Sequence, residues 1–328
     1  MPYPAIIRRL IAPAAALAAL LLTIVTAGAA SASVQSSSAQ TFLPVNYDFA
    51  AGAATTFNSP TTPPPGANNF SCQPSAAHPN PVVLVHGTLA NMNDSWQAAS
   101  PILANHGYCV FAFNYGGSSP TSDLQGTGDI AASAQQLATF VNQVLAATGA
   151  LKVDLVGHSQ GGMMPRYYIN FLGGAAKVAT FVALAPSNYG TTLDGLTQLG
   201  QQLGLILPIN GVLSTVCTAC VEQEKGSAFL KTLNATPTVA GVNYTVIESR
   251  DDEVVTPYTN AFLPAAPNVT NITVNKQCVL DSSDHLEIVA DPVAMADMLN
   301  ALDPAHPVRV PCLVVLPVTG PIGPVPSF

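Results

Sequence analysis

One serine lies in a pattern that could make it a nucleophile. Residues 152–162 read as a short β-branched strand, the pattern Gly-x-Ser-x-Gly centred on Ser159, and the start of a helix. The sharp turn that such a serine needs leaves no room for side chains at Gly157 and Gly161. It also points the Gln160 N–H at the place where negative charge would develop. We therefore predict that Ser159 is a nucleophile. The competing interpretation is a tight turn with an idle serine.

A serine hydroxyl is a weak nucleophile at neutral pH and needs a base. His285 lies in a polar segment between the last predicted strand and the last predicted helix, and such loops line the sites of open α/β sheets. His86 and His158 belong to strand-end turns, where we expect them to buttress the loops. We predict that His285 is the base. The remaining histidines, in irregular segments or at a helix end, are His78, His106 and His306.

The histidine needs an acid to fix its tautomer and to stabilise its charged form. Four acidic residues lie between serine and histidine, in or beside the loop that leaves the predicted strand 244–248: Glu248, Asp251, Asp252 and Glu253. The residues alone do not separate the adjacent Asp251 and Asp252. Asp284 is too close in sequence to His285 to be the first choice, and we expect it at most to support the loop.

Negative charge on a tetrahedral intermediate would need two N–H donors. The first is Gln160, directly after the nucleophile, and the second should come from the first strand-to-helix loop, residues 86–88. We predict Thr88 as this second donor, and its hydroxyl could be a third. The alternative is that Thr88 is a plain turn residue.

Strands must alternate with helices to position these residues. We predict apolar strands at 82–85, 108–115, 153–156, 178–184, 244–248 and 269–274, and helices at 96–105, 126–148, 163–172 and 292–302. This alternation predicts an α/β fold with a mostly parallel sheet that has helices on both faces. Pro165 falls inside the helix after Ser159 and should distort it.

The longest interruption of this alternation spans residues 187–240. Apolar residues recur there at helical spacing, and two interpretations compete. The first is a core-facing helix of the crossover connection. The second is a mobile lid or cover whose side chains contact a substrate. The residues concerned are Leu193, Leu196, Leu199, Leu203 and Ile206.

Length and composition fit one large domain with tails. The chain has 328 residues, 48% hydrophobic and 9% charged, and its net charge of -8 argues against nucleic acid as a partner. Residues 1–32 carry basic residues, an apolar run and small residues, which is typical of a secretory signal peptide; the alternative is an uncleaved membrane anchor. We expect an extended arm at 33–80, the catalytic domain at 81–303 and a proline-rich tail at 304–328.

Export would place the six cysteines in an oxidising compartment. Six cysteines allow fifteen pairings, and composition does not choose among them. For Cys217 and Cys220 we expect a local disulfide rather than a zinc knuckle, because no second Cys-x-x-Cys pair and no nearby histidine accompany them.

Taken together, these segments resemble the secreted bacterial lipases of the class 2 group and the fungal lipase B type. The matching segments are 83–88, 157–162, 184–191, 252–257 and 284–285. The resemblance implies an α/β-hydrolase fold with an insert between strands 6 and 7 of the family's sheet. Residues 187–240 match weakly, so lid behaviour does not follow from it. Lipase B also lacks histidine at the positions of His86 and His158.

The resemblance also implies residue roles. It selects Asp252 as the acid, and it implies oxyanion donors at Thr88 and Gln160, with the Thr88 hydroxyl contributing. The cysteine pairs that it implies are Cys72–Cys109 and Cys278–Cys312, which leaves Cys217–Cys220.

The function implied is that of a secreted carboxylic-ester hydrolase, a triacylglycerol lipase that works as a monomer without cofactor or metal on lipid or ester substrates at a lipid–water interface. Three other functions would use the same triad: a short-chain carboxylesterase, a polyester hydrolase and an acyltransferase. A serine peptidase or amidase and a non-catalytic binding protein are further alternatives.

Overall fold

A six-stranded parallel sheet forms the centre of the protein. The computed structural model describes residues 42–203 and 216–328. The strands are β1 (Val82–Val85), β2 (Val110–Phe113), β3 (Val153–His158), β4 (Val178–Leu184), β5 (Asn243–Glu248) and β6 (Val269–Thr273). They lie in the order β2-β1-β3-β4-β5-β6, and every neighbouring pair is parallel. The prediction of a mostly parallel sheet is therefore confirmed.

The strand order reverses next to β1, which lies between β2 and β3. At such a switch point the connections leave towards opposite faces of the sheet, and a crevice opens beyond the carboxyl ends of the strands. Two of the predicted functional segments, residues 86–88 and Ser159, follow β1 and β3 directly. The topology therefore brings them together.

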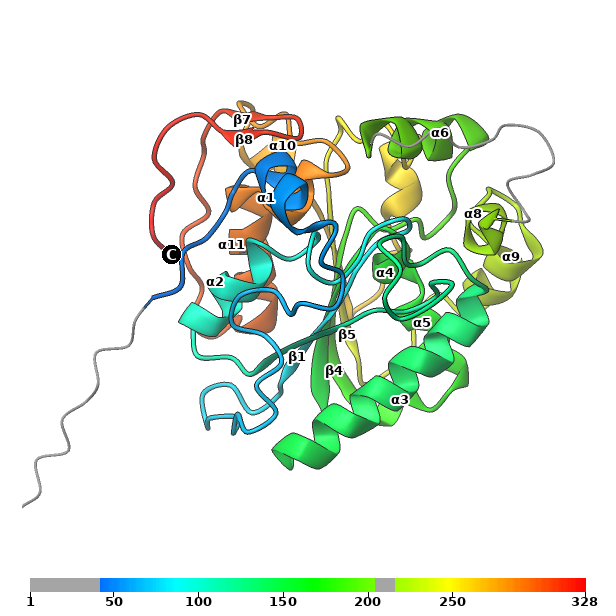
Figure 1. Ribbon diagram of the computed structural model, residues 1–328, viewed down its shortest axis with the longest axis horizontal. Helices are drawn as coiled ribbons and strands as arrows, with labels where there is room; N and C mark the ends of the chain where they lie inside the picture. The colour runs from blue at the N-terminus through cyan, green and yellow to red at the C-terminus, as the bar shows by residue number, and fades with distance from the viewer. Residues whose placement is uncertain (1–41, 204–215) are drawn as a thin grey trace, which may run out of the picture. The chain divides into compact units, whose positions relative to one another are not determined.

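Helices cover both faces of the sheet (Figure 1). On one face Val83 and Val85 share a buried apolar cluster with residues of α3 and α5. On the other, Val82 and Leu84 share a cluster with residues of α2 and α11. Because both faces are covered, the strands read as continuous apolar runs. The helices are α2 (Ala99–Asn105), α3 (Ile130–Thr148), α4 (Gln160–Met163), α5 (Pro165–Phe171) and α11 (Pro292–Leu302).

Two helices begin later than predicted, and one is divided. The Asp129 side chain accepts the Ala132 N–H at 2.7 Å and so starts α3 at Ile130 rather than at residue 126. Likewise α2 starts at Ala99 rather than at residue 96. Pro165 interrupts the helix after Ser159, as predicted. It becomes the first residue of α5, where a missing N–H costs no hydrogen bond.

The arm before β1 is not extended throughout, which corrects the expectation for residues 33–80. It contains helix α1 (Phe49–Thr56), and the Asp48 side chain caps this helix by accepting the Ala51 N–H at 2.8 Å. The tail after α11 forms a small antiparallel hairpin of β7 (Val315–Leu316) and β8 (Gly320–Pro321).

The long insert joins β4 to β5. Among the described residues of the insert, the helices are α6 (Leu193–Gln202), α8 (Thr218–Glu222) and α9 (Ala228–Asn234). A further short helix, α10 (Val274–Gln277), follows β6. Leu196 and Leu199 are buried in the two core clusters, and Leu203 is partly buried against the second. These positions fit the core-facing interpretation of α6. Substrate contact by this helix stays a prediction, and Ile206 lies outside the described residues.

All six cysteines are paired, and the pairs are those that the resemblance implies: Cys72–Cys109, Cys217–Cys220 and Cys278–Cys312. Disulfides persist in oxidising compartments, so the folded chain suits an extracellular environment. Within residues 42–203 and 216–328, no helix is long and apolar enough to cross a membrane. The predicted signal peptide lies outside the described residues.

The disulfide between Cys278 and Cys312 should stabilise the folded protein mainly because it closes a long loop of the chain. These cysteines are 34 residues apart, so the double variant Cys278→Ala/Cys312→Ala should lower the free energy of unfolding by about 2–4 kcal/mol in urea titration. The matched control is Cys217→Ala/Cys220→Ala, whose cysteines are 3 residues apart, with an expected loss of about 2 kcal/mol or less. A larger loss in the control would contradict this account.

Candidate active site

Ser159 lies at a strained turn between β3 and α4. Its backbone has φ 53° and ψ −120°, a conformation that residues with side chains rarely adopt. A Cβ on Gly157 would lie 1.8 Å from the Gly161 carbonyl oxygen, and a Cβ on Gly161 would lie 2.1 Å from that of Val85. Glycine is therefore required at both positions, as the sequence predicts, and the turn lifts the serine side chain beyond the sheet.

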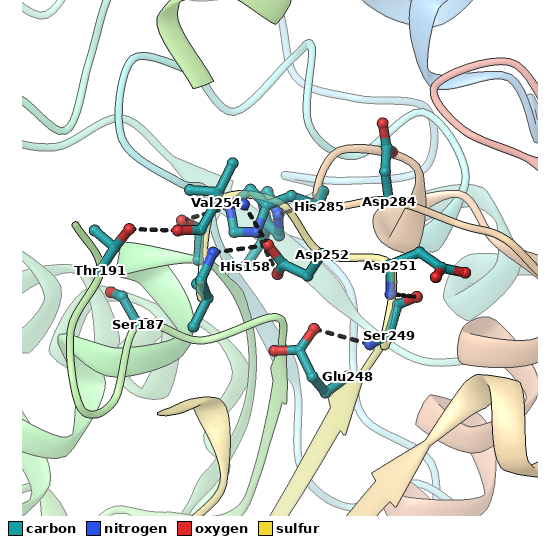
Figure 2. Close-up of polar contacts among 12 residues, drawn as sticks. His158, Ser187, Thr191, Glu248, Ser249, Asp251, Asp252, Val254, Asp284 and His285 are labelled. Carbon is teal, nitrogen blue, oxygen red and sulfur yellow. Dashed lines mark hydrogen bonds and ion pairs between the residues drawn. The ribbon is translucent and has the colours of Figure 1, made fainter. Parts of the chain in front are cut away.

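His285 bridges this serine and an aspartate. Its Nε2 is 3.0 Å from Ser159 Oγ, and its Nδ1 is 2.7 Å from Asp252 Oδ2, a contact drawn in Figure 2. With the proton on Nδ1 donated to Asp252, Nε2 is free to accept the serine O–H. All three residues are buried, at 4% exposure or less. The arrangement can therefore draw a proton from the serine hydroxyl.

Backbone geometry distinguishes the two adjacent aspartates. Asp252 Oδ1 accepts the N–H groups of Val254 and Val255 at 2.8 and 2.7 Å, which leaves Oδ2 directed at His285. Asp251 instead accepts a hydrogen bond from the Asn275 side-chain amide at 3.1 Å. Figure 2 shows the Asp251 carboxylate pointing away from His285. Of the four acidic candidates, Asp252 is the one that bonds to His285.

The charge around His285 favours its protonated form. Burial by itself lowers the pKa of His285, but the charge of Asp252 and the hydrogen bond to it, together with the charges of Glu253 and Asp284, outweigh burial. The pKa of His285 is therefore raised above its ordinary value. A base of this kind accepts a proton more readily than free imidazole does.

His158 and His86, the histidines of the two strand-end turns, support the loops around the site, as expected from the sequence. His158 is buried, and its Nε2 bonds to the His285 carbonyl oxygen at 2.8 Å. Burial, followed by the charge of His285, lowers the pKa of His158 well below its ordinary value, so the ring is neutral and donates to that oxygen. His86 stacks on Tyr115 with ring centroids 4.3 Å apart, and the Tyr115 hydroxyl donates to the His86 carbonyl oxygen at 2.5 Å.

Thr88 and Gln160 meet beside the serine, and a third residue joins them. The Thr88 hydroxyl donates to Gln160 Oε1 at 2.6 Å and accepts from Gln223 Nε2 at 2.8 Å. The hydroxyl proton is thus directed to Gln160 in this structure, so its expected contribution to an oxyanion stays a prediction. The Gln160 N–H is the first of α4 and has no intrahelical acceptor.

Gln223 is a residue of this site that the sequence does not predict. It directly follows α8 in the insert, and Ser187 donates to its Oε1 at 2.8 Å. The nearest signal in the sequence is the Cys217–Cys220 disulfide, which braces α8. That signal indicates a local constraint but does not identify the glutamine.

Asp284 ties the histidine loop to two distant segments. Its Oδ1 accepts the N–H groups of Glu287 at 2.8 Å and Val318 at 3.3 Å, and its Oδ2 accepts from Gln202 of α6 at 3.3 Å. The supporting role expected of Asp284 fits these contacts.

A family model described as Lipase (class 2) matches residues 79–296, which contain the serine, the aspartate and the histidine. The chain belongs to the class 2 lipase family. The resemblance seen in the sequence is therefore confirmed.

Two curated relatives of this class 2 lipase are similar over part of their length. It is 43% identical over 125 residues to a triacylglycerol lipase of Pseudarthrobacter phenanthrenivorans and, over the same length, to one of Burkholderia plantarii. Each match covers 37% of this chain, and 35% and 31% of the two relatives. The chain thus spans about a third of the length of these relatives.

Among solved structures, Aspergillus fumigatus lipase B superposes on this class 2 lipase with a TM-score of 0.53 at 18% identity. The match covers 76% of this chain and 57% of that one. At this identity the likeness shows the fold alone, and it confirms the predicted α/β-hydrolase fold.

The turn at Ser159 predicts a large steric cost at one glycine. In Gly161→Ala the new Cβ would meet the carbonyl oxygens of Val85 and His86 at 2.1 and 2.3 Å, and backbone cannot move aside as a flexible side chain can. We expect a loss of about 3 kcal/mol in the free energy of unfolding, measured by urea titration.

The matched control is Gly149→Ala. Gly149 has φ 69°, and an added methyl carbon would have no atom within 4 Å, so this change costs only the left-handed conformation, about 1–2 kcal/mol. Equal losses in the two variants would contradict the steric account.

Proposed function

We propose that this chain is a secreted carboxylic-ester hydrolase, a triacylglycerol lipase that works through an acyl-enzyme on Ser159. The observation that carries the proposal is the hydrogen-bonded series Asp252–His285–Ser159 at a strained strand-to-helix turn. Membership of the class 2 lipase family and the two similar triacylglycerol lipases support the choice of an ester substrate.

In the first half of the reaction, Ser159 Oγ attacks the ester carbonyl carbon and its proton passes to His285 Nε2. Asp252 stabilises the imidazolium, and the N–H groups of Thr88 and Gln160 stabilise the negative oxygen of the intermediate. The intermediate collapses, the bond to the alcohol oxygen breaks, and His285 returns its proton to that oxygen. An acyl group then remains on Ser159.

In the second half, water attacks the acyl carbon and gives its proton to His285 Nε2. The new intermediate collapses to the carboxylic acid, and the proton on His285 returns to Ser159 Oγ. The two halves use the same base and the same oxyanion donors, so one site suffices. An alcohol that replaced water in this half would make the enzyme an acyltransferase.

The proposal also includes the place where the enzyme acts. We infer secretion through the signal peptide of residues 1–32, which the three disulfides suit, and action as a monomer at a lipid–water interface. The net charge of -8 fits a neutral lipid better than a polyanion.

The substrate class predicts how activity depends on acyl length. With p-nitrophenyl esters from acetyl to stearoyl, measured below and above their solubility, turnover should rise with chain length and at the emulsion surface. Ser159→Ala should lower kcat about 10⁵-fold or more, because the nucleophile is gone. Turnover confined to the shortest esters would identify a short-chain carboxylesterase or polyester hydrolase instead. A folded protein with no ester turnover would overturn the proposal and leave amides to be tested.

The protonation of His285 predicts the pH dependence. Only neutral His285 accepts the serine proton, so kcat/KM should fall as pH drops through the pKa of His285. Because that pKa is raised, the midpoint should lie above about pH 6.5, the ordinary value for histidine. In Asp252→Asn the charge that raises this pKa is gone, so the midpoint should move to lower pH, and kcat should fall about 10⁴-fold.

Asp251→Asn is the matched control. Asp251 bonds to Asn275 and not to His285, so its kcat and its midpoint should match those of the unmodified enzyme. Identical effects in the two variants would contradict the assignment of Asp252.

A further inference from the structure

Glu248 is a buried acid that the reaction as described does not use. It is the last residue of β5 and has 0% exposure. Its Oε1 accepts the Ser249 N–H at 2.8 Å, a bond drawn in Figure 2. Its Oε2 is buried as well, and no donor from the described part of the chain reaches it. An ionised carboxylate in such a place would be short of hydrogen bonds.

No cation compensates this acid. In the described ranges the ion pairs are His285–Asp252 and His306–Asp303, and neither includes Glu248. The nearby Arg250 is exposed. A buried carboxylate without a cationic partner is costly, so the neutral acid is the favoured form of Glu248.

The Glu248 side chain lies beside that of Asp252 (Figure 2), close enough for a hydrogen bond between the two carboxyl groups. Two carboxyl groups can share one only if one of them carries a proton. The Asp252 carboxylate already accepts three N–H groups, from Val254, Val255 and His285, and these stabilise its charge. Glu248 accepts one. In a hydrogen bond between them the proton would therefore belong to Glu248, and Asp252 would accept it.

The electrostatics agree with this geometry. Burial, followed by the charge of Asp252, raises the pKa of Glu248 well above its ordinary value. Glu253 also raises it. The charges of Glu253 and Asp284 already act on His285, and a further ionised carboxylate here would add repulsion to Asp252.

We propose that Glu248 is a positioning residue of the active site, a neutral carboxylic acid whose O–H bonds to the Asp252 carboxylate and keeps it facing His285 Nδ1. The inference rests on the proposed function. The O–H fills the remaining acceptor position of the carboxylate without adding charge. One oxygen of Asp252 then accepts backbone N–H groups, and the other accepts the N–H of His285. Glu248, at the end of β5, donates the remaining hydrogen bond.

Two substitutions of similar size separate the hydrogen bond from the charge. Glu248→Gln keeps an acceptor for the Ser249 N–H and supplies an amide N–H to Asp252 in place of the O–H. It should retain kcat within about twofold. Glu248→Met keeps the volume but offers no donor, so kcat should fall about tenfold or more with KM unchanged, the expected effect of losing a hydrogen bond to a charged group.

Two further readouts exclude a merely structural role. The pH midpoint of kcat/KM in Glu248→Gln should equal that of the unmodified enzyme, because no charge is removed. The proton between His285 Nδ1 and Asp252 should give a far-downfield ¹H NMR signal in the unmodified enzyme and in Glu248→Gln. In Glu248→Met this signal should be shifted or lost, while thermal unfolding shows that the protein is folded.

Three outcomes would overturn the proposal. The first is an unchanged kcat and an unchanged NMR signal in folded Glu248→Met. The second is a Glu248→Gln variant that is as impaired as Glu248→Met. The third is a pH midpoint in Glu248→Gln that moves to lower pH, as loss of an ionised group near His285 would require. If Glu248→Met does not fold, Glu248→Gln still decides through its kcat and midpoint. The NMR signal does not depend on turnover, so it reports on Glu248 even if the enzyme hydrolyses no ester.

Discussion

The strained backbone of Ser159 is the constraint on which the rest of the structure depends. A residue with a side chain stays at φ 53° only when its surroundings leave no alternative. Here the surroundings are a fully buried strand, β3, between two parallel neighbours, and a helix that begins at the next residue. Gly161 packs its backbone against that of Val85 in β1, so the turn is locked to the centre of the sheet. The hydroxyl therefore has a defined position before any substrate binds.

The partners of this serine reach it from segments far apart in the sequence. Asp252 and His285 follow β5 and β6, and Thr88 follows β1. Their loops are tied together by contacts near the triad: His158 bonds to the backbone of His285, and Asp284 links α6 to the tail near β7. The insert and the tail thus stabilise the loop that carries the base. The charges of Asp252, Glu253 and Asp284 all raise the pKa of His285, so the base depends on acidic residues from two different loops.

Much of this could be predicted from the sequence because the signals are local. Continuous apolar runs mark strands that are buried on both faces, and Ser159 with its two glycines marks a turn that few sequences can form. Residues that act through long-range contacts could not be predicted in the same way. The choice between Asp251 and Asp252 depends on where the N–H groups of Val254 and Val255 point.

Long-range contacts also explain the other features that the sequence does not predict. Nothing beside Gln223 in the sequence indicates that it meets Thr88 from the other side of the site. Glu248 could be recognised as an acidic candidate, but its burial beside Asp252 depends on how side chains pack at the carboxyl end of β5. Helix α1 lies in an arm without apolar periodicity, where a single capping residue, Asp48, has more influence than the pattern around it.

Covalent labelling with a fluorophosphonate, followed by peptide mapping, tests directly whether His285 activates Ser159 as a nucleophile. We expect one adduct, on Ser159, whose rate of formation rises with pH as His285 loses its proton. Labelling should nearly cease in folded His285→Ala. An adduct on another serine, or undiminished labelling of Ser159 without His285, would contradict this mechanism.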